Sequence, residues 1–119
     1  MDRAEQTKQT LTQLYGRSDS PLAGTDPEFA AIKTRLIYGE VYAEEKLSAK
    51  LRELLTFAVL SAQGGCEPQV KAHVGGNAAV GNGKETLLAA LTLCMPYIGF
   101  PRTLNALGCI NAVLPEAEG

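Results

Sequence analysis

Apolar residues recur at the spacing of an α-helix along nearly the whole of this 119-residue chain. The clearest run lies between residues 47 and 62, where apolar positions follow one another at helical intervals. No stretch shows the strict two-residue alternation of a half-buried strand. The pattern therefore predicts an all-α fold, a bundle of about six helices. The apolar positions of the clearest run are Leu47, Leu51, Leu54, Leu55, Ala58, Val59 and Ala62.

Glycine, proline and capping residues predict where these helices begin and end. Thr25 and Glu28 form a capping-box pattern with Pro27 in the first turn. The consecutive glycines 64–65 are a natural stop for the clearest helix, because glycine accepts a left-handed cap. Pro96 is expected to interrupt the fifth helix. The predicted helices cover residues 3–15, 25–42, 47–63, 67–80, 84–95 and 99–114, with a loop over 16–24, a turn at 81–83 and a frayed tail from 116.

Length, charge and apolar pattern restrict the class of protein. A chain of this length fits a single domain over residues 1–119. The formal net charge is −2, no basic block is present, and no apolar stretch is long enough to cross a bilayer, so neither nucleic acid nor membrane is an expected partner. The N-terminus has no apolar signal core, which favours a cytoplasmic protein. The third and fifth helices are apolar around more than half their circumference, which favours a homo-oligomer over a monomer.

Cys66 and His73 are the most informative pair of polar residues. Seven residues separate them, close to two helical turns, so both side chains fall on nearly the same helix face. A thiol and an imidazole on one face can support proton transfer or thiolate chemistry. His73 is the only histidine, and the three cysteines have no Cys-x-x-Cys spacing, so neither a zinc site within one chain nor a disulfide framework is expected. No metal or organic cofactor is implied.

Three segments, in this order, resemble the carboxymuconolactone decarboxylase family. Residues 51–60 look like its first signature helix. Residues 70–74, followed by 82–85, resemble its histidine helix and the Asn-Gly turn after it. Residues 97–107 match its Tyr-x-Gly-x-Pro-x-x-x-Asn-Ala segment. The resemblance covers a core of about residues 26–114. It implies an all-helical fold around a central helical hairpin, of the alkylhydroperoxidase-like type, assembled as a trimer or hexamer with sites near subunit contacts.

The family that the chain resembles has two branches with different chemistry. One contains decarboxylases of a lactone acid, which retain the histidine. The other contains alkylhydroperoxidase-like thiol peroxidases, which use Cys-x-x-Cys on the histidine helix and a glutamate on the preceding helix. Cys66 matches the first cysteine, His73 the histidine, and Glu53 lies near the expected glutamate. Gln69 occupies the position of the second cysteine, so the adjacent resolving thiol of that branch is missing here.

His73 is either a general acid or base or a structural residue that hydrogen-bonds across helices, and the family resemblance favours the first. Cys66 is either a reactive thiol or a small buried residue. The positive helix end favours its thiolate, and the negative charge of Glu67 opposes it. Glu53 either points to solvent, the commoner case on such a helix, or turns inward to pair with His73 and hold a proton relay.

The remaining candidates have more modest predicted roles. Arg52 is either a ligand for a substrate carboxylate or a solvated neighbour of Glu53. Tyr97 shapes the break between the last two helices and is a weaker candidate for a pocket residue. The residues at 82–83 indicate a turn and not a ligand site. Cys94 and Cys109 are expected in the core.

Three hypotheses about function follow. The first is a decarboxylase-like enzyme in which His73 delivers a proton to a small carboxylated substrate, Glu53 orients it, and an apolar pocket between helices holds the substrate. The second is a single-cysteine thiol peroxidase in which Cys66 attacks a peroxide and an external thiol resolves the sulfenic acid. The third is a non-catalytic binding module, because fold does not fix function.

Overall fold

The computed structural model describes residues 24–41 and 43–115. The predicted first helix over 3–15, most of the loop after it, and the acidic tail lie outside the described residues. The chain divides into two compact units, residues 1–48 and 49–119, and each is considered by itself. All regular structure in the described ranges is helical, which confirms the predicted fold class.

The first unit contains α2 (Pro27–Lys33), continued by a π-helical segment, Thr34–Val41. The predicted helix start is wrong by one residue, because Asp26 and not Thr25 occupies the N-cap. Proline disfavours the helical conformation in the residue before it, and Asp26 accordingly has φ −137° and ψ 76°. The carbonyl of Asp26 still accepts the first helical hydrogen bond, from the amide of Ala30. The helix therefore forms where the sequence predicts it, with Asp26 and not Thr25 as its N-cap.

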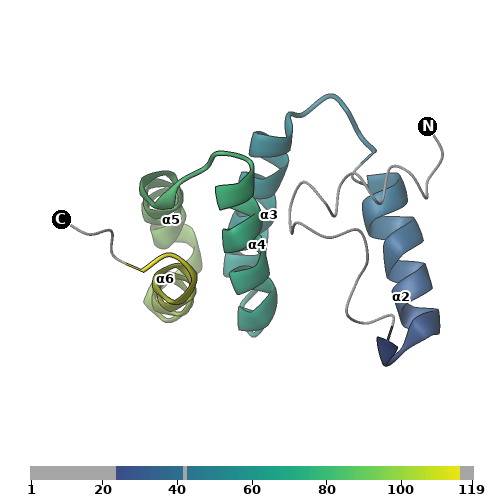
Figure 1. The fold of residues 1–119 in the computed structure, drawn as a ribbon. Helices are drawn as coiled ribbons and strands as arrows, with labels where there is room; N and C mark the ends of the chain where they lie inside the picture. The colour runs from purple at the N-terminus through teal and green to yellow at the C-terminus, as the bar shows by residue number, and fades with distance from the viewer. Residues whose placement is uncertain (1–23, 42, 116–119) are drawn as a thin grey trace. The chain divides into compact units, whose positions relative to one another are not determined.

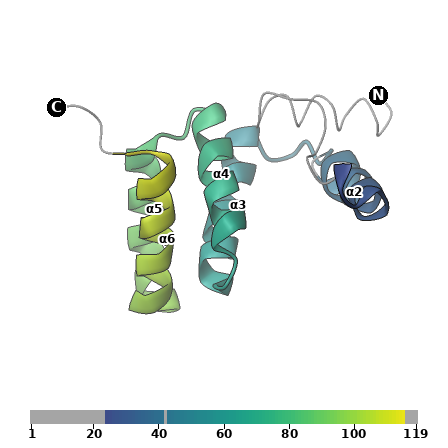
Figure 2. The same cartoon turned by 60° about the horizontal axis from the view of Figure 1, so that its bottom comes forward.

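The second unit is a bundle of four helices arranged as two hairpins. The first hairpin joins α3 (Ala49–Gln63) to α4 (Glu67–Ala79), and the second joins α5 (Lys84–Ile98) to α6 (Phe100–Val113). The two hairpins lie side by side in both views (Figures 1 and 2). Helix α6 packs against α3, α4 and α5, and α3 also contacts both α4 and α5. The central helical hairpin expected from the sequence is thus α3–α4.

All four helices contribute apolar residues to the core of the bundle. Phe57, Val74, Leu87 and Ile110 are completely buried. Burying each of these side chains contributes about 1.5 to 3 kcal/mol, so the four of them account for a large share of the bundle's stability. The rest of the buried cluster consists of Val70, Leu91, Ala106 and Cys109.

Only part of the apolar stripe predicted for α3 is buried: Leu54 packs against the core, as does Leu60. Leu51, Leu55 and Val59 are 51%, 52% and 62% exposed, whereas Phe57 is buried together with Glu53 and Ser61. The two sets are offset by two residues, which is about 200° around a helix, so they occupy opposite sides. The part of the stripe formed by Leu51, Leu55 and Val59 therefore faces away from α4, α5 and α6.

The positions of the turns agree with the sequence prediction better than the buried helix faces do. Gly64 and Gly65, with φ of 74° and 73°, reverse the chain between α3 and α4, as predicted. Pro96, in contrast, does not interrupt α5, which continues to Ile98. Proline removes one backbone donor, and here it does so in the last turn of the helix, where little helix remains to be disrupted. Gly99, with φ 87°, makes the actual break between α5 and α6.

Candidate functional site

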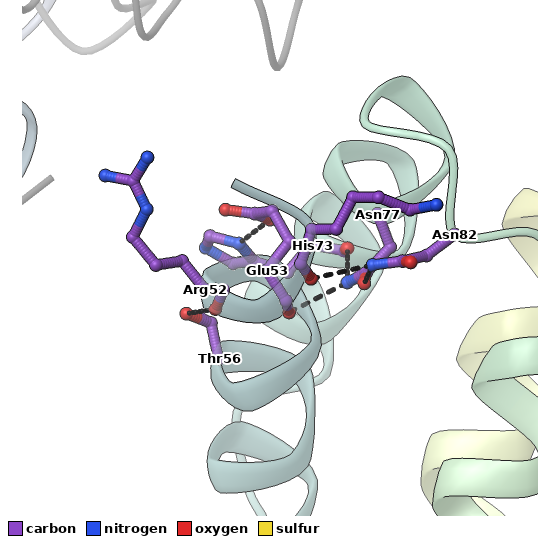
Figure 3. Close-up of polar contacts among 7 residues, drawn as sticks. Arg52, Glu53, Thr56, His73, Asn77 and Asn82 are labelled. Carbon is purple, nitrogen blue, oxygen red and sulfur yellow. Dashed lines mark hydrogen bonds and ion pairs between the residues drawn. The ribbon is translucent and has the colours of Figure 1, made fainter. Parts of the chain in front are cut away.

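The α3–α4 hairpin brings Glu53 and His73 together, although twenty positions separate them in sequence. Nδ1 of His73 lies 2.9 Å from Oε1 of Glu53 (Figure 3). Glu53 comes from the first half of α3 and His73 from the middle of α4. Because the short glycine turn makes the two helices antiparallel neighbours, the start of α3 meets the later part of α4. This is the inward orientation of Glu53 that the sequence left open.

The two side chains of this acid–histidine pair differ in exposure. The side chain of Glu53 is 1% exposed and that of His73 is 14% exposed. A carboxylate that is shielded from water needs a partner to offset its desolvation, and the imidazole N–H supplies one. Donation from Nδ1 to the carboxylate sets the tautomer of a neutral ring and leaves Nε2 as the atom that can exchange a proton with a ligand.

Two buried asparagines hold the acid–histidine pair in place. Nδ2 of Asn77 donates to the backbone carbonyl of Glu53 at 2.9 Å and to that of His73 at 2.7 Å. Nδ2 of Asn82 donates to Oδ1 of Asn77 at 2.9 Å and to the carbonyl of Lys50 at 2.8 Å. These bonds tie the first turns of α3 to the end of α4 (Figure 3). The backbone register between Glu53 and His73 is therefore fixed by side-chain amides.

The sequence reasoning did not single out Asn77, and it treated Asn82 only as part of a turn. Asn77 is fully buried and Asn82 is 6% exposed. A turn does follow α4, but Asn82 also reaches back across it. The available signal was the spacing: Asn77 lies one helical turn after His73, on the same face of α4. Two polar residues, His73 and Asn77, on one face of the same helix indicate a hydrogen-bond network on that face.

Cys66 is the N-cap residue of α4, which agrees with its predicted position near the start of this helix. Its side chain is half-buried, and its Sγ lies 3.3 Å from the carbonyl oxygen of Leu60, to which the thiol donates. Cys66 and His73 belong to the same helix, but the hydrogen-bond partner of His73 is Glu53 and not the thiol.

Arg52 and Tyr97 occupy less enclosed positions. The half-buried Arg52 precedes Glu53 on α3, its carbonyl accepts a 2.8 Å bond from the hydroxyl of Thr56, and its guanidinium extends away from Asn77 and Asn82 (Figure 3). Tyr97 is 88% exposed and lies near the C-terminal end of α5, whereas Asn82 lies just before the N-terminal end of that helix. A binding role for Tyr97 needs another surface that closes over it.

The outer face of α3 also carries a small apolar hollow. Leu55, Thr56, Val59 and Leu60 line it, all from the same helix. Leu55 and Val59 are on the side of α3 opposite Glu53, and His73 is not among the residues that line the hollow. The pocket between helices that the sequence suggested therefore stays a prediction.

Within residues 24–41 and 43–115, histidine, cysteine, aspartate and glutamate do not gather in groups of three that could hold a metal ion. In the same ranges the helices are too short or too polar for one to span a bilayer.

Fold and site together define a class: an all-helical protein whose central hairpin carries a buried glutamate bonded to a histidine. The chain matches the model of the carboxymuconolactone decarboxylase family over residues 27–112, which is more than half of its length. It therefore belongs to this family, as the resemblance in the sequence indicated. A search of curated proteins found no match.

Proposed function

We propose that this protein is a decarboxylase-like enzyme in which His73 transfers a proton to or from a small carboxylated substrate. The observation that carries the proposal is the 2.9 Å contact between Nδ1 of His73 and the buried carboxylate of Glu53. A carboxylate behind an imidazole orients the ring and stabilises its protonated form, which is the arrangement that a general acid or base needs.

Loss of carbon dioxide leaves an electron pair on the former α-carbon, as a carbanion or enolate. Nε2 of His73 delivers the proton that this carbon needs, and the imidazolium charge that precedes the transfer is balanced by Glu53. Because Glu53 is shielded from water, its electrostatic effect on the ring is greater than that of an exposed carboxylate. Arg52 is the candidate for binding the substrate carboxylate, since a guanidinium can hold a carboxylate with two parallel hydrogen bonds.

The test uses variants that keep a polar side chain, because an alanine at position 73 would leave the Glu53 carboxylate buried without its partner. We expect His73→Gln to lower the turnover of carboxylated lactones by about 10² to 10⁴-fold, the usual contribution of a general acid or base. Glu53→Gln keeps a side chain of the same shape and should lower turnover less. Carbon dioxide release measures the reaction. Lys71→Ala, at an exposed position of the same helix, is the matched control.

A second candidate function rests on the position of Cys66. A half-buried thiol at the start of α4, on the helix that carries His73, fits the single-cysteine peroxidase hypothesis. Cys66→Ser separates the two candidates, since it should abolish peroxide consumption and leave carbon dioxide release unchanged. A folded protein in which neither Cys66→Ser nor His73→Gln changes any activity would contradict both candidates and favour the non-catalytic binding module.

We further propose that the chain forms a homo-oligomer, a trimer or hexamer as the family resemblance implies, in the cytoplasm. The supporting observation is the outer stripe of α3, formed by Leu51, Leu55 and Val59, which is more than half exposed. Covering such a stripe with a second copy removes apolar surface from water.

A further inference from the structure

A second cysteine lies against the first turn of α4, where Cys66 is located. Sγ of Cys109, on α6, is 3.6 Å from the carbonyl oxygen of Glu67, the residue that directly follows Cys66. Cys66 itself packs against the buried cluster of which Cys109 is a member. Sequence alone does not suggest this proximity, because forty-three positions separate the two cysteines and they belong to different hairpins.

We propose that Cys109 is the resolving cysteine for Cys66, and that oxidation by a hydroperoxide links the two residues in a disulfide between α4 and α6. The inference rests on the second candidate function, in which Cys66 reacts with peroxide. In this inference Cys109, on α6, takes the role of the second cysteine, whose position on α4 is occupied by Gln69.

The reaction balances in three steps. The Cys66 thiolate attacks one oxygen of a hydroperoxide, the O–O bond breaks, an S–O bond forms, and an alcohol or water leaves after taking up a proton. The Cys109 thiol then attacks the sulfenic sulfur, an S–S bond forms, the S–O bond breaks, and water leaves with the thiol proton. An external dithiol returns the two electrons by thiol–disulfide exchange and is itself oxidised to a disulfide.

The surroundings of the two cysteines fit different parts of this cycle. Cys66 is half-buried at a helix start, so a peroxide can reach it. Cys109 is 2% exposed, and burial raises the pKa of its thiol, an effect that Glu67 and Cys66 increase and Lys71 opposes. Cys109 therefore remains a thiol at neutral pH and does not compete with Cys66 for peroxide.

A disulfide between the two residues requires Cα atoms about 4.4 to 6.8 Å apart and a specific dihedral angle. The Cys66 side chain has to leave the carbonyl of Leu60 and turn toward α6. Cys66 is at the N-cap and follows the two glycines of the turn, so it lies outside the helical residues of α4. The Cys109 thiol already faces the first turn of α4, since it donates to the carbonyl of Glu67.

The sequence makes the experiment direct, because trypsin cleavage after Arg52, Lys71, Lys84 and Arg102 places the three cysteines on separate peptides. The full-length protein is treated with one equivalent of hydrogen peroxide, blocked with an alkylating agent, digested without reductant and analysed by mass spectrometry. We expect peptide 53–71 linked to peptide 103–119, with one hydrogen lost from each thiol. The oxidised protein should run as a monomer on a denaturing gel without reductant, since the bond lies within one chain.

Variants of the cysteines show whether the Cys109 thiol resolves the Cys66 sulfenic acid or whether Cys66 is only oxidised. In Cys109→Ser and Cys109→Ala the linked peptide should be lost, and a sulfenic acid at Cys66 should accumulate that a dimedone probe labels. Cys94→Ser, at a half-buried position of α5, is the matched control and should still form the link.

Two outcomes overturn the inference in distinguishable ways. If Cys66 of the unaltered protein gives as much dimedone adduct as the Cys109 variants, or links to Cys94 or to a second chain, Cys109 is not the resolving residue, but the peroxidase candidate survives. If Cys66 does not react with peroxide, both the candidate function and the inference fail.

Discussion

Glu53 is the residue whose environment matters most for the proposed chemistry. A carboxylate with 1% exposure is costly to keep in a helical bundle, and the bundle meets this cost with the imidazole of His73. The neighbouring backbone is satisfied separately by Asn77. Removing either partner would leave a buried polar group without this bond, so the pair acts as a unit.

Cys109 is the residue that links stability to pH. Burial raises the pKa of its thiol, so the native state keeps the proton at a pH where the unfolded chain has released it. Stability is then lost as the pH rises above about 8.5, the ordinary pKa of a cysteine. We expect the free energy of unfolding of Cys109→Ala to fall less between about pH 7 and pH 10 than that of the unaltered protein.

Urea titrations under reducing conditions at a series of pH values measure this difference. Other groups that titrate in the same range, such as Lys71 and the tyrosines, are present in both proteins, so the comparison isolates Cys109. Parallel pH dependences of the two proteins would show that the environment of this thiol differs from the one described.

At the scale of the elements, the α3–α4 hairpin is held in register by amide side chains. Nδ2 of Asn77 donates to one carbonyl on each helix. In Asn77→Asp the donor is replaced by a second negative charge beside Glu53, and the two carbonyls lose a partner. We expect this variant to lose about 3 kcal/mol or more of stability, since an unsatisfied buried group costs about 1 to 3 kcal/mol and a buried unpaired charge costs more.

Hydrogen exchange of the α3 amides, together with chemical denaturation, tests this role of Asn77. Asn105→Asp makes the same chemical change at an exposed position of α6 and should have little effect. If both substitutions are tolerated equally, the amide bonds at Asn77 do not hold the hairpin.

At the scale of the whole molecule, the exposed stripe of α3 is the feature that calls for a partner. Leu51, Leu55 and Val59 follow one another at intervals of four residues on the side opposite Phe57. If this stripe is a subunit contact, Leu55→Lys places a charge in an apolar interface, and we expect the main species to shift to a smaller assembly.

Light scattering coupled to gel filtration measures that shift. Gln63→Lys introduces a positive charge at an exposed position of the same helix and should leave the assembly intact. A protein that is monomeric before any substitution, or an assembly that withstands Leu55→Lys, would contradict the assignment of this stripe to the contact.

The sequence alone determined the helical class, the helix boundaries on either side of Gly64 and Gly65, the family, and the helix that carries both Cys66 and His73. These properties depend on local spacing and on the backbone preferences of glycine and proline, which can be read one segment at a time. Two predictions at prolines were wrong: Thr25 is not the N-cap before Pro27, and Pro96 does not break α5. Both errors concern where a helix begins or ends, and neither changes which helices are present.

Only the tertiary structure decided which side of α3 is buried, that Glu53 faces His73, that Asn77 and Asn82 complete the network, and that Cys109 lies beside the turn of Cys66. Each of these depends on how one helix is rotated against another. Periodicity shows that a helix has an apolar side, but α3 has apolar residues on two sides. Leu51, Leu55 and Val59 are exposed, whereas Leu54, Phe57 and Leu60 pack in the core. The choice between them depends on the combined packing of four helices, which no single segment of the chain encodes.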